Sequence, residues 1–366
     1  MSKVPIKKII LEDGAEQYPL SSKIFNSLQD VPVQRIGSEK SAQRPEKGHK
    51  FRMGKDTLHL LAFQGEFLKP CPGTKEYICC GYQILNIATN CPLDCSYCIL
   101  QSYFNHPNLR IFVNLEERLK QALKVTDAHP EEIFRIGTGE FTDSLALDHL
   151  VGWSELLLPE FTKRKNIMLE LKTKTNNIKK LLDLDIRQRI VVSWTLNSPF
   201  ITANEEHLAV SLEKRLKAAR RCQEEGFILG FHFDPLVFHS NWQESYLKTV
   251  ELLDKYINPK GIIWISMGSM RFMPKLKAII KNRHPRTNVL KGEFIRGLDG
   301  KMRYFKPLRI QLYTHLRKIL EQWYPDLGLY LCMEADDVWQ KSMGWSPLNL
   351  SGLKGYLDQR VKYFFG

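Results

Sequence analysis

Three closely spaced cysteines are the residues of this chain best suited to chemistry. Cys91, Cys95 and Cys98 lie in the segment Asn-Cys-Pro-Leu-Asp-Cys-Ser-Tyr-Cys, a C-x3-C-x2-C pattern that follows an apolar run. Thiolates bind soft metal centres, and three of them can hold three irons of a four-iron, four-sulfur cluster. The fourth iron then has no protein ligand and can bind another molecule. The spacing therefore predicts a reactive cluster on a short loop.

Two other interpretations of the triplet are open. A structural zinc site would need a fourth Cys or His at short range, and the nearest are Cys79, Cys80 and His106, none in a familiar zinc spacing. The triplet could also be three reduced core cysteines, but Pro92 and Asp94 are typical of a polar turn.

The elements that must position the triplet alternate along the chain. Short apolar runs predict six strands, at Tyr82–Ala88, Ile133–Gly137, Ile167–Lys172, Ile190–Leu196, Phe227–Phe233 and Gly261–Ser266. Apolar residues spaced three to four apart predict helices between them, at Leu115–Thr126, Ala146–Thr162, Thr175–Leu184, Glu205–Glu224 and Trp242–Tyr256. This alternation predicts an α/β fold of parallel βα units, open or closed as a barrel. The triplet follows the first strand, so it lies at the carboxyl ends of the strands, where such folds carry their chemistry.

The chain is expected to have three parts. Residues 1–80 form an N-terminal extension that contains a polar loop at Ile36–Lys55, and residues 81–268 form the barrel. Residues 269–366 form a C-terminal extension packed on the barrel. Its expected elements are a helix over Met270–His284, a hairpin over Gly292–Phe305 and a helix over Leu308–Trp323.

Composition restricts the setting of the protein. The eight cysteines among 366 residues do not form a disulfide framework, and neither a signal peptide nor a membrane-spanning run is recognised. We therefore expect a cytoplasmic protein without a membrane partner. The net charge of +13 favours a polyanionic partner, nucleic acid first, although the same charge can serve solubility alone.

Further polar residues stand at the ends of the predicted strands. Glu140 closes Gly-Thr-Gly-Glu after the second strand, where a carboxylate can accept hydrogen bonds from an ammonium group. Lys174 follows the third strand and could pair with a carboxylate. Thr195 and Asn197 share one face of the fourth strand, and such groups suit a ribose or a carboxylate. His232 and Asp234 share a face of the fifth strand, as substrate contacts or as an ordinary hydrogen-bonded pair.

The spacing of the triplet, with Tyr97 directly before the third cysteine, resembles the signature of the radical S-adenosylmethionine enzymes. The resemblance implies a partial six-stranded barrel of the (β/α)6 type. It also implies a [4Fe-4S] cluster whose open iron is chelated by S-adenosyl-L-methionine. Electron transfer to this cofactor, from a donor such as flavodoxin or ferredoxin, then gives a 5′-deoxyadenosyl radical that abstracts hydrogen from the substrate. In this comparison Glu140 resembles the element that grips the methionine amino group, with Lys174, Thr195 and Asn197 as further cofactor contacts.

The chain also resembles the spore photoproduct lyase family, whose members repair a thymine dimer in DNA. The matching segments are Glu16-Gln-Tyr-Pro-Leu20, Cys98-Ile-Leu-Gln101, Thr173-Lys174, Leu181-Leu-Asp183, Leu196-Asn197, Leu229-Gly-Phe231 and Arg271-Phe-x-Pro274. The resemblance implies a lyase acting on DNA, with Tyr97 retained beside the cluster as a candidate catalytic residue.

Two departures from the family pattern concern the last step of the reaction. The family has a cysteine after the second strand that returns a hydrogen atom to the product radical. In an ungapped match Glu140 takes that position, and no cysteine lies between Cys98 and Cys222. Ile99 replaces a tyrosine that follows the third cluster cysteine. The sequence therefore predicts that the chain still binds the cofactors. It also predicts that the last step, in which a hydrogen atom is returned to the product radical, differs from that of the family.

Three alternatives to a DNA lyase stay open. A radical enzyme acting on a peptide or small metabolite would show no affinity for DNA. A non-catalytic iron-sulfur protein that binds nucleic acid would not cleave S-adenosylmethionine. A zinc-stabilised binding module would hold zinc instead of iron.

Overall fold

An eight-stranded sheet forms the centre of the computed structural model, which describes residues 5–37, 53–74 and 76–366. Its strand order is β16-β12-β11-β10-β9-β8-β5-β4, and only the edge strand β4 runs antiparallel to its neighbour. The strands are β4 Leu68–Pro70, β5 Gln83–Leu85, β8 Phe134–Gly137, β9 Ile167–Thr173, β10 Ile190–Thr195, β11 Ile228–Leu236, β12 Ile262–Ser269 and β16 Leu329–Leu331. All residues of β10 and β12 are buried, as expected for parallel strands covered on both faces.

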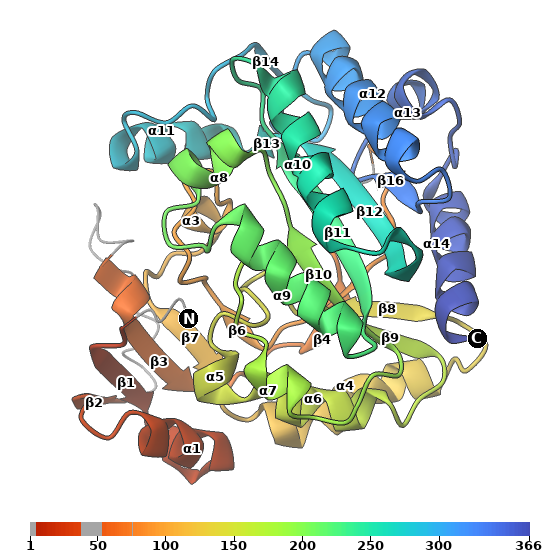
Figure 1. Ribbon diagram of the computed structural model, residues 1–366. Helices are drawn as coiled ribbons and strands as arrows, with labels where there is room; N and C mark the ends of the chain where they lie inside the picture. The colour runs from red at the N-terminus through yellow and green to blue at the C-terminus, as the bar shows by residue number, and fades with distance from the viewer. Residues whose placement is uncertain (1–4, 38–52, 75) are drawn as a thin grey trace.

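Helices cover the outer face of the curled sheet (Figure 1). The helices from residue 100 onward are, in chain order, α3 Leu100–Tyr103, α4 Leu115–Asp127, α5 Asp148–Val151, α6 Trp153–Phe161, α7 Lys179–Leu182, α8 Pro199–Glu205, α9 Leu212–Glu224, α10 Trp242–Tyr256, α11 Pro274–Arg283, α12 Lys306–Trp323, α13 Asp336–Met343 and α14 Leu350–Phe365. The partial barrel with N-terminal and C-terminal extensions is confirmed.

The N-terminal part adds a second sheet, which the sequence pattern did not predict. Its order is β2-β1-β3-β7-β6, and helix α1, Pro19–Ser27, lies beside it (Figure 1). The strands are β1 Lys8–Glu12, β2 Val33–Ile36, β3 Thr57–Leu61, β6 Ala88–Thr89 and β7 Leu109–Phe112. Most of the predicted polar loop, residues 38–52, lies outside the described residues, and Met53–Asp56 forms a 3-10 turn.

The first predicted strand, Tyr82–Ala88, divides between the two sheets. Gln83–Leu85 pairs with β8 in the large sheet, whereas Ala88–Thr89 pairs with β7 in the N-terminal sheet. The chain therefore passes from one sheet to the other directly before the cysteine loop, and that loop lies where the two sheets meet.

Three predicted helices are shorter or broken. Gly152, with φ +72°, separates α5 from α6 inside the predicted Ala146–Thr162 helix. Thr175 and its neighbours bond the local backbone, so only Lys179–Leu182 of the third predicted helix is helical. The predicted Glu205–Glu224 helix begins at Leu212, where the Ser211 side chain accepts a hydrogen bond from the Lys214 N–H.

The C-terminal part extends the sheet instead of only packing on it. Helix α11, the hairpin of β14 Phe294–Arg296 and β15 Met302–Tyr304, and α12 confirm the three predicted elements; β13 Arg271–Phe272 pairs with β15. β16 pairs in parallel with β12, however, so the sheet crosses both predicted boundaries, at 81 and at 268. The division into three parts stays a prediction.

Buried Glu334 ties this C-terminal part together. Its carboxylate pairs with Arg309 at 3.0 Å and accepts a hydrogen bond from Tyr313 at 2.8 Å, and the Tyr313 hydroxyl accepts one from the Ser269 N–H at 2.7 Å. None of the helices in the described ranges has the length and apolar character that crossing a membrane requires.

Replacing Tyr313 with Phe should destabilise the protein by about 1–3 kcal/mol, because the change leaves the Ser269 N–H and a Glu334 oxygen without this partner. Urea unfolding measures the effect. The control is Tyr363→Phe, whose side chain is 80% exposed and which should change stability by less than about 0.5 kcal/mol. Equal effects of the two variants would contradict the role of the Tyr313 hydroxyl.

Candidate active site

The cysteine loop is shaped by two residues with left-handed backbone. Asn90 has φ +75° and Asp94 has φ +51°, a region that Asn and Asp tolerate better than most residues. The Asn90 side chain accepts a hydrogen bond from the Cys91 N–H at 2.9 Å and donates one to the Pro107 carbonyl at 2.7 Å. These two hydrogen bonds help to fix the conformation of the loop.

Side chains from distant segments hold the loop on one side. Asp94 pairs with Arg283 of α11 at 2.7 Å, and Lys55 donates a hydrogen bond to the Cys91 carbonyl. Gln101 donates to the carbonyls of Cys95, at 3.2 Å, and Ser96, at 2.9 Å. These interactions involve the backbone and Asp94 of the loop and do not use the three cysteine thiols.

The end of α8 holds the loop on its other side. The backbone of Cys95 pairs with that of Glu206, whose carboxylate accepts the Tyr97 hydroxyl and forms a fully buried ion pair with Arg215. Burial alone would raise the pKa of Glu206, but Arg215 and Lys174 outweigh it and hold the pKa below its ordinary value. Tyr97, the candidate catalytic residue, thus has its hydroxyl bound inside the protein, and its catalytic role stays a prediction.

The donor set fits an iron-sulfur cluster better than a single ion. All eight cysteines are free thiols, and the Sγ atoms of Cys91, Cys95 and Cys98 do not all lie within 4.8 Å of one another. A tetrahedral zinc with bonds of about 2.3 Å would bring its sulfur ligands to about 3.8 Å apart. A cluster, whose irons lie at separate corners, accepts wider spacing. Among the described residues, the spacing argues against the zinc interpretation.

The loop after β8 is more compact than its sequence suggests. A Cβ atom on Gly137 would overlap the Tyr82 hydroxyl, and one on Gly139 would lie 2.8 Å from the Lys172 Cβ. Both glycines therefore admit neighbouring side chains, not only a ligand. Glu140 at the end of the loop forms an ion pair with Lys172. A cofactor ammonium would have to share or replace that lysine.

Asp143 holds this loop to β9, a role that the sequence did not reveal. Its buried carboxylate accepts hydrogen bonds from the N–H groups of Leu145, Ala146 and Lys174 at 2.8–3.0 Å and from the Thr173 hydroxyl at 2.7 Å. Burial nevertheless raises the pKa of Asp143 above its ordinary value. Only the pattern Asp-Ser-Leu-Ala, an acidic residue before a helix, could have suggested it.

The other residues predicted to contact the cofactor differ in whether their polar groups are free to do so. The Lys174 ammonium lies 5.9 Å from the centre of the Tyr97 ring and close enough to Cys95 to lower its pKa against the larger effect of burial. Thr195 is buried on the inner side of β10. Asn197 is fully buried, and its amide bonds the Pro235 carbonyl, the Ser198 N–H and the Tyr246 hydroxyl. This geometry favours a structural role for Asn197 over the predicted cofactor contact.

A polar layer across the inside of the barrel was also missed. Glu170 of β9, 1% exposed, accepts hydrogen bonds from four side chains on four other strands or their flanks. The donors are Tyr82 at 2.6 Å, Ser193, His232 at 2.9 Å and Trp264 at 2.9 Å. His232 also bonds Ser266 at 2.6 Å, whereas Asp234 pairs with Arg271 at 2.8 Å. His232 and Asp234 therefore belong to separate networks.

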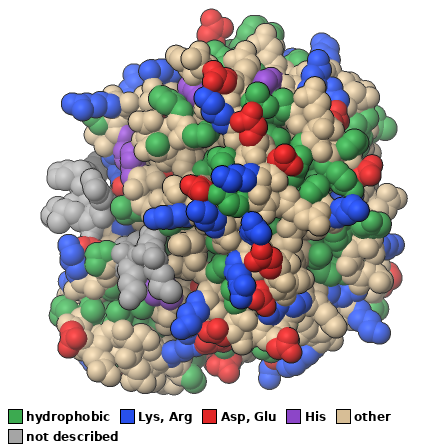
Figure 2. Space-filling view, in the orientation of Figure 1, with side chains coloured by type: hydrophobic (Ala, Val, Ile, Leu, Met, Phe, Trp, Pro, Cys, Tyr) green, Lys and Arg blue, Asp and Glu red, His purple; other side chains and the backbone are tan. Residues whose placement is uncertain are grey.

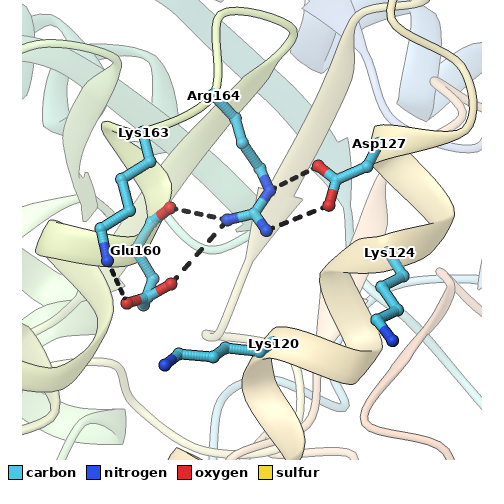
Figure 3. Close-up of a pocket in the computed structure, with 6 residues that line it drawn as sticks. All are labelled: Lys120, Lys124, Asp127, Glu160, Lys163 and Arg164. Atoms are coloured by element: carbon cyan, nitrogen blue, oxygen red, sulfur yellow. Dashed lines mark hydrogen bonds and ion pairs between the residues drawn. The ribbon is translucent and has the colours of Figure 1, made fainter.

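A surface hollow between α4 and α6 has no part in this site. Lys120, Lys124, Asp127, Glu160, Lys163 and Arg164 line it (Figure 3). Arg164 lies between Asp127, at 2.6 Å, and Glu160, which also pairs with Lys163 (Figure 3). The hollow lies on the outer helices, away from the cysteine loop (Figure 1).

Comparison with known proteins decides the family. A family model described as spore photoproduct lyase matches residues 4–328. The chain belongs to the spore photoproduct lyase family. It is 26% identical over 290 residues to the spore photoproduct lyase of Bacillus subtilis (strain 168), covering 77% of this chain and 83% of the relative. The spore photoproduct lyase of Geobacillus sp. (strain Y412MC61) is 24% identical over 291 residues, covering 77% and 84% of the two chains.

Solved structures of the family share the fold. A Cys-to-Ala variant of spore photoproduct lyase with dinucleoside spore photoproduct superposes with a TM-score of 0.80 at 24% identity, covering 90% of this chain and 99% of that one. A double variant with bound AdoMet and the same dinucleoside gives a TM-score of 0.79 at 23% identity, covering 92% and 100%. Family membership confirms a radical S-adenosylmethionine protein with a [4Fe-4S] cluster and S-adenosylmethionine as cofactors.

Replacing Cys95 with Ala should abolish cluster assembly, because two thiolates remain where three are needed. Iron content and the visible absorption of the reconstituted protein measure the loss. Cys79→Ala is the matched control, since the Cys79 thiol bonds the backbone of Thr74 on a different loop, and it should keep its iron. Normal iron content in the Cys95 variant would contradict the assignment.

Replacing Glu170 with Gln should lower stability by about 3 kcal/mol near neutral pH, because a buried charge with matched donors is removed. Burial would raise the pKa of Glu170, but His232 and the other donors hold it far below its ordinary value. A depressed folded-state pKa gives stability above the unfolded value of about 4.3 that is lost as pH falls below it. The difference between wild type and variant should therefore shrink from pH 6 to pH 3 in urea unfolding. Exposed Glu213→Gln should show almost no difference, and a constant gap for Glu170→Gln would refute the electrostatic origin.

Proposed function

We propose that the protein is a lyase acting on DNA photolesions through hydrogen abstraction by a 5′-deoxyadenosyl radical. The observation that carries the proposal is a cysteine loop held by side-chain hydrogen bonds, in a member of this family, at the end of a barrel lined with polar groups. When bound, the cluster and S-adenosylmethionine supply the radical. Cys91, Cys95 and Cys98 hold the cluster.

The remaining predicted residues surround the place of the cofactor. Lys174 offers its ammonium to a carboxylate beside Cys95, and Thr195 offers a hydroxyl from the next strand. Glu140 accepts the amino group, with Lys172 released from its ion pair. Tyr97 fixes the loop through Glu206, so its contribution to catalysis is to position the cluster.

Charge distribution supports a nucleic-acid substrate that approaches along α11. The exposed cations Lys275, Lys277 and Lys281 of α11 form no ion pair in the described part of the chain, and Arg283 of the same helix reaches the cysteine loop. Over the centre of the face shown in Figure 2, where α9 lies, acidic side chains lie among the Lys and Arg side chains. The cations of α9 are of this kind, because three of them pair with glutamates four residues away. Unpaired cations beside the site suit phosphate contacts.

An electron donor and a cellular compartment complete the proposal. A one-electron donor such as flavodoxin or ferredoxin reduces the cluster. The reducing cytoplasm supports both the cluster and eight free cysteines.

The reduced, reconstituted enzyme should release 5′-deoxyadenosine and restore thymidine in ultraviolet-irradiated DNA that carries spore photoproduct. Chromatography with mass spectrometry measures both products. Unirradiated DNA is the matched control and should give no repair. Cofactor cleavage without repair would exclude this substrate, and absence of cofactor cleavage would overturn the radical chemistry.

Replacing Lys277 and Lys281 with Ala should weaken binding to irradiated duplex DNA, because fewer phosphates are neutralised. The slope of log affinity against log salt should fall by about 0.9 for each phosphate that is no longer neutralised. Fluorescence anisotropy at several salt concentrations measures the slope. The control pair is Lys217→Ala with Arg220→Ala on α9, whose charges are already paired. An unchanged slope in the α11 variant would exclude this helix from the interface.

A further inference from the structure

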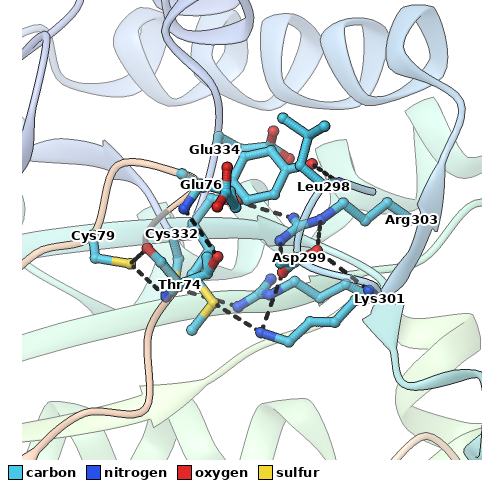
Figure 4. A network of polar contacts seen from close by, with 12 residues as sticks. Thr74, Glu76, Cys79, Leu298, Asp299, Lys301, Arg303, Cys332 and Glu334 are labelled. Carbon is cyan, nitrogen blue, oxygen red and sulfur yellow. Dashed lines mark hydrogen bonds and ion pairs between the residues drawn. The ribbon is translucent and has the colours of Figure 1, made fainter. Parts of the chain in front are cut away.

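Four cysteines outside the cluster loop gather at one edge of the barrel. Cys71, Cys79 and Cys80 lie between β4 and β5, and Cys332 follows β16. The Cys71 thiol interacts electrostatically with those of Cys79 and Cys80, and the Cys332 thiol with those of Cys71 and Cys80. Figure 4 shows Cys79 and Cys332 near Thr74. Residues far apart in sequence thus place several thiols beside the active site.

Cys71 is the member of this group that reaches the cluster loop. It packs against the small apolar group Ile84, Leu100 and Phe141, and Cys91 and Cys98 of the loop pack against the same group. Its backbone N–H donates to the Tyr82 carbonyl at 2.8 Å, next to the tyrosine that bonds Glu170. Cys71 therefore lies between the cluster loop and the polar layer inside the barrel.

Cys71 also lies beside Glu140, the residue that replaces the family's hydrogen-donating cysteine in an ungapped match. Among the charged groups around the Cys71 thiol, Glu140 has the largest effect on its pKa. Burial first, and then Glu140, raise the pKa of Cys71 above its ordinary value, so the thiol keeps its proton at neutral pH. A protonated thiol has an S–H bond to give.

The other thiols have different surroundings, and Cys80 packs against the main apolar core. Cys332 accepts a hydrogen bond from Arg271 at 3.3 Å, and Cys79 bonds the backbone of Thr74. Cys222 is fully buried in the core beneath α9. Cys71 alone among these combines partial exposure with contact to the apolar group that the cluster cysteines share.

The loop that carries Cys71 is held in place by the C-terminal part. The Ile78 N–H donates to the Glu334 carbonyl at 3.0 Å, and the Leu298 N–H donates to the Tyr77 hydroxyl at 3.2 Å. The Arg303 guanidinium lies over the Tyr77 ring at 4.0 Å and pairs with Asp299 at 2.7 Å, within the network of Figure 4. These contacts hold Tyr77 and Ile78. Cys71 itself is held by the hydrogen bond from its N–H to the Tyr82 carbonyl.

We propose that Cys71 is a catalytic residue of this chain, the hydrogen-atom donor that replaces the cysteine missing at Glu140. The proposal rests on the proposed function. The substrate carbon radical takes the hydrogen atom of Cys71, so that its S–H bond breaks, a C–H bond forms and a Cys71 thiyl radical remains. One electron from the donor protein and one proton from solvent then restore the thiol. Because 5′-deoxyadenosine is not used to restore it, one molecule accumulates for each lesion repaired.

The test is turnover of dinucleoside spore photoproduct in D2O, where thiol hydrogens exchange with solvent. Wild type should give repaired dinucleoside that carries one solvent deuterium. Cys71→Ser, whose O–H bond is too strong to donate, should still release 5′-deoxyadenosine while the labelled product falls about tenfold or more. Cys79→Ala is the matched control and should behave as wild type.

A second measurement needs no turnover. In the reconstituted enzyme kept without reductant, added dinucleoside should slow alkylation of Cys71 by N-ethylmaleimide, mapped by mass spectrometry, and should not slow that of Cys79. Unchanged deuterium in the Cys71→Ser product, or no protection of Cys71, would overturn the proposal while leaving the proposed function intact. Absence of 5′-deoxyadenosine from wild type would instead refute the proposed function.

Discussion

The buried ion pair of Glu206 and Arg215 is the interaction on which the site depends. Both side chains are fully removed from solvent, so either charge alone would be costly, and each is tolerated only because the other is present. Glu206 also accepts the Tyr97 hydroxyl and pairs its backbone with Cys95. The Glu206 carboxylate therefore joins the cysteine loop to the end of α8 and to Arg215 of α9. The neighbouring Glu205, bonded to Ser96 and to Asn288, repeats the arrangement toward α11.

The fold could be predicted from the sequence where a segment forms its structure by itself. The apolar runs of β8, β9, β10, β11 and β12 were located within a few residues, because fully buried parallel strands have an unmistakable composition. The errors occur where tertiary contacts prevail. Tyr82–Ala88 has one continuous apolar pattern but serves two sheets, and β16 is too short to be recognised before its partner β12 is known.

The site could be predicted only where chemistry lies in a local motif. The spacing of Cys91, Cys95 and Cys98 by itself indicates an iron-sulfur cluster site, and family membership confirms the cofactors that it implies. The role of Glu170 could not be predicted in this way, because its hydrogen-bond partners lie on other strands and no local motif surrounds it. Asn197 shows the opposite error. Its type and place suited a cofactor contact, but its neighbours in space already satisfy its amide.

The contact between the Cys71–Cys80 loop and the C-terminal part has a consequence for how the protein is made. The cluster cysteines leave the ribosome long before Glu334, which holds Ile78 through backbone pairing. During synthesis the chain thus acquires its metal ligands first and the last anchor of its thiol loop near the end. During translation, the chain is therefore able to bind a cluster before it has the residues that complete the surroundings of a radical.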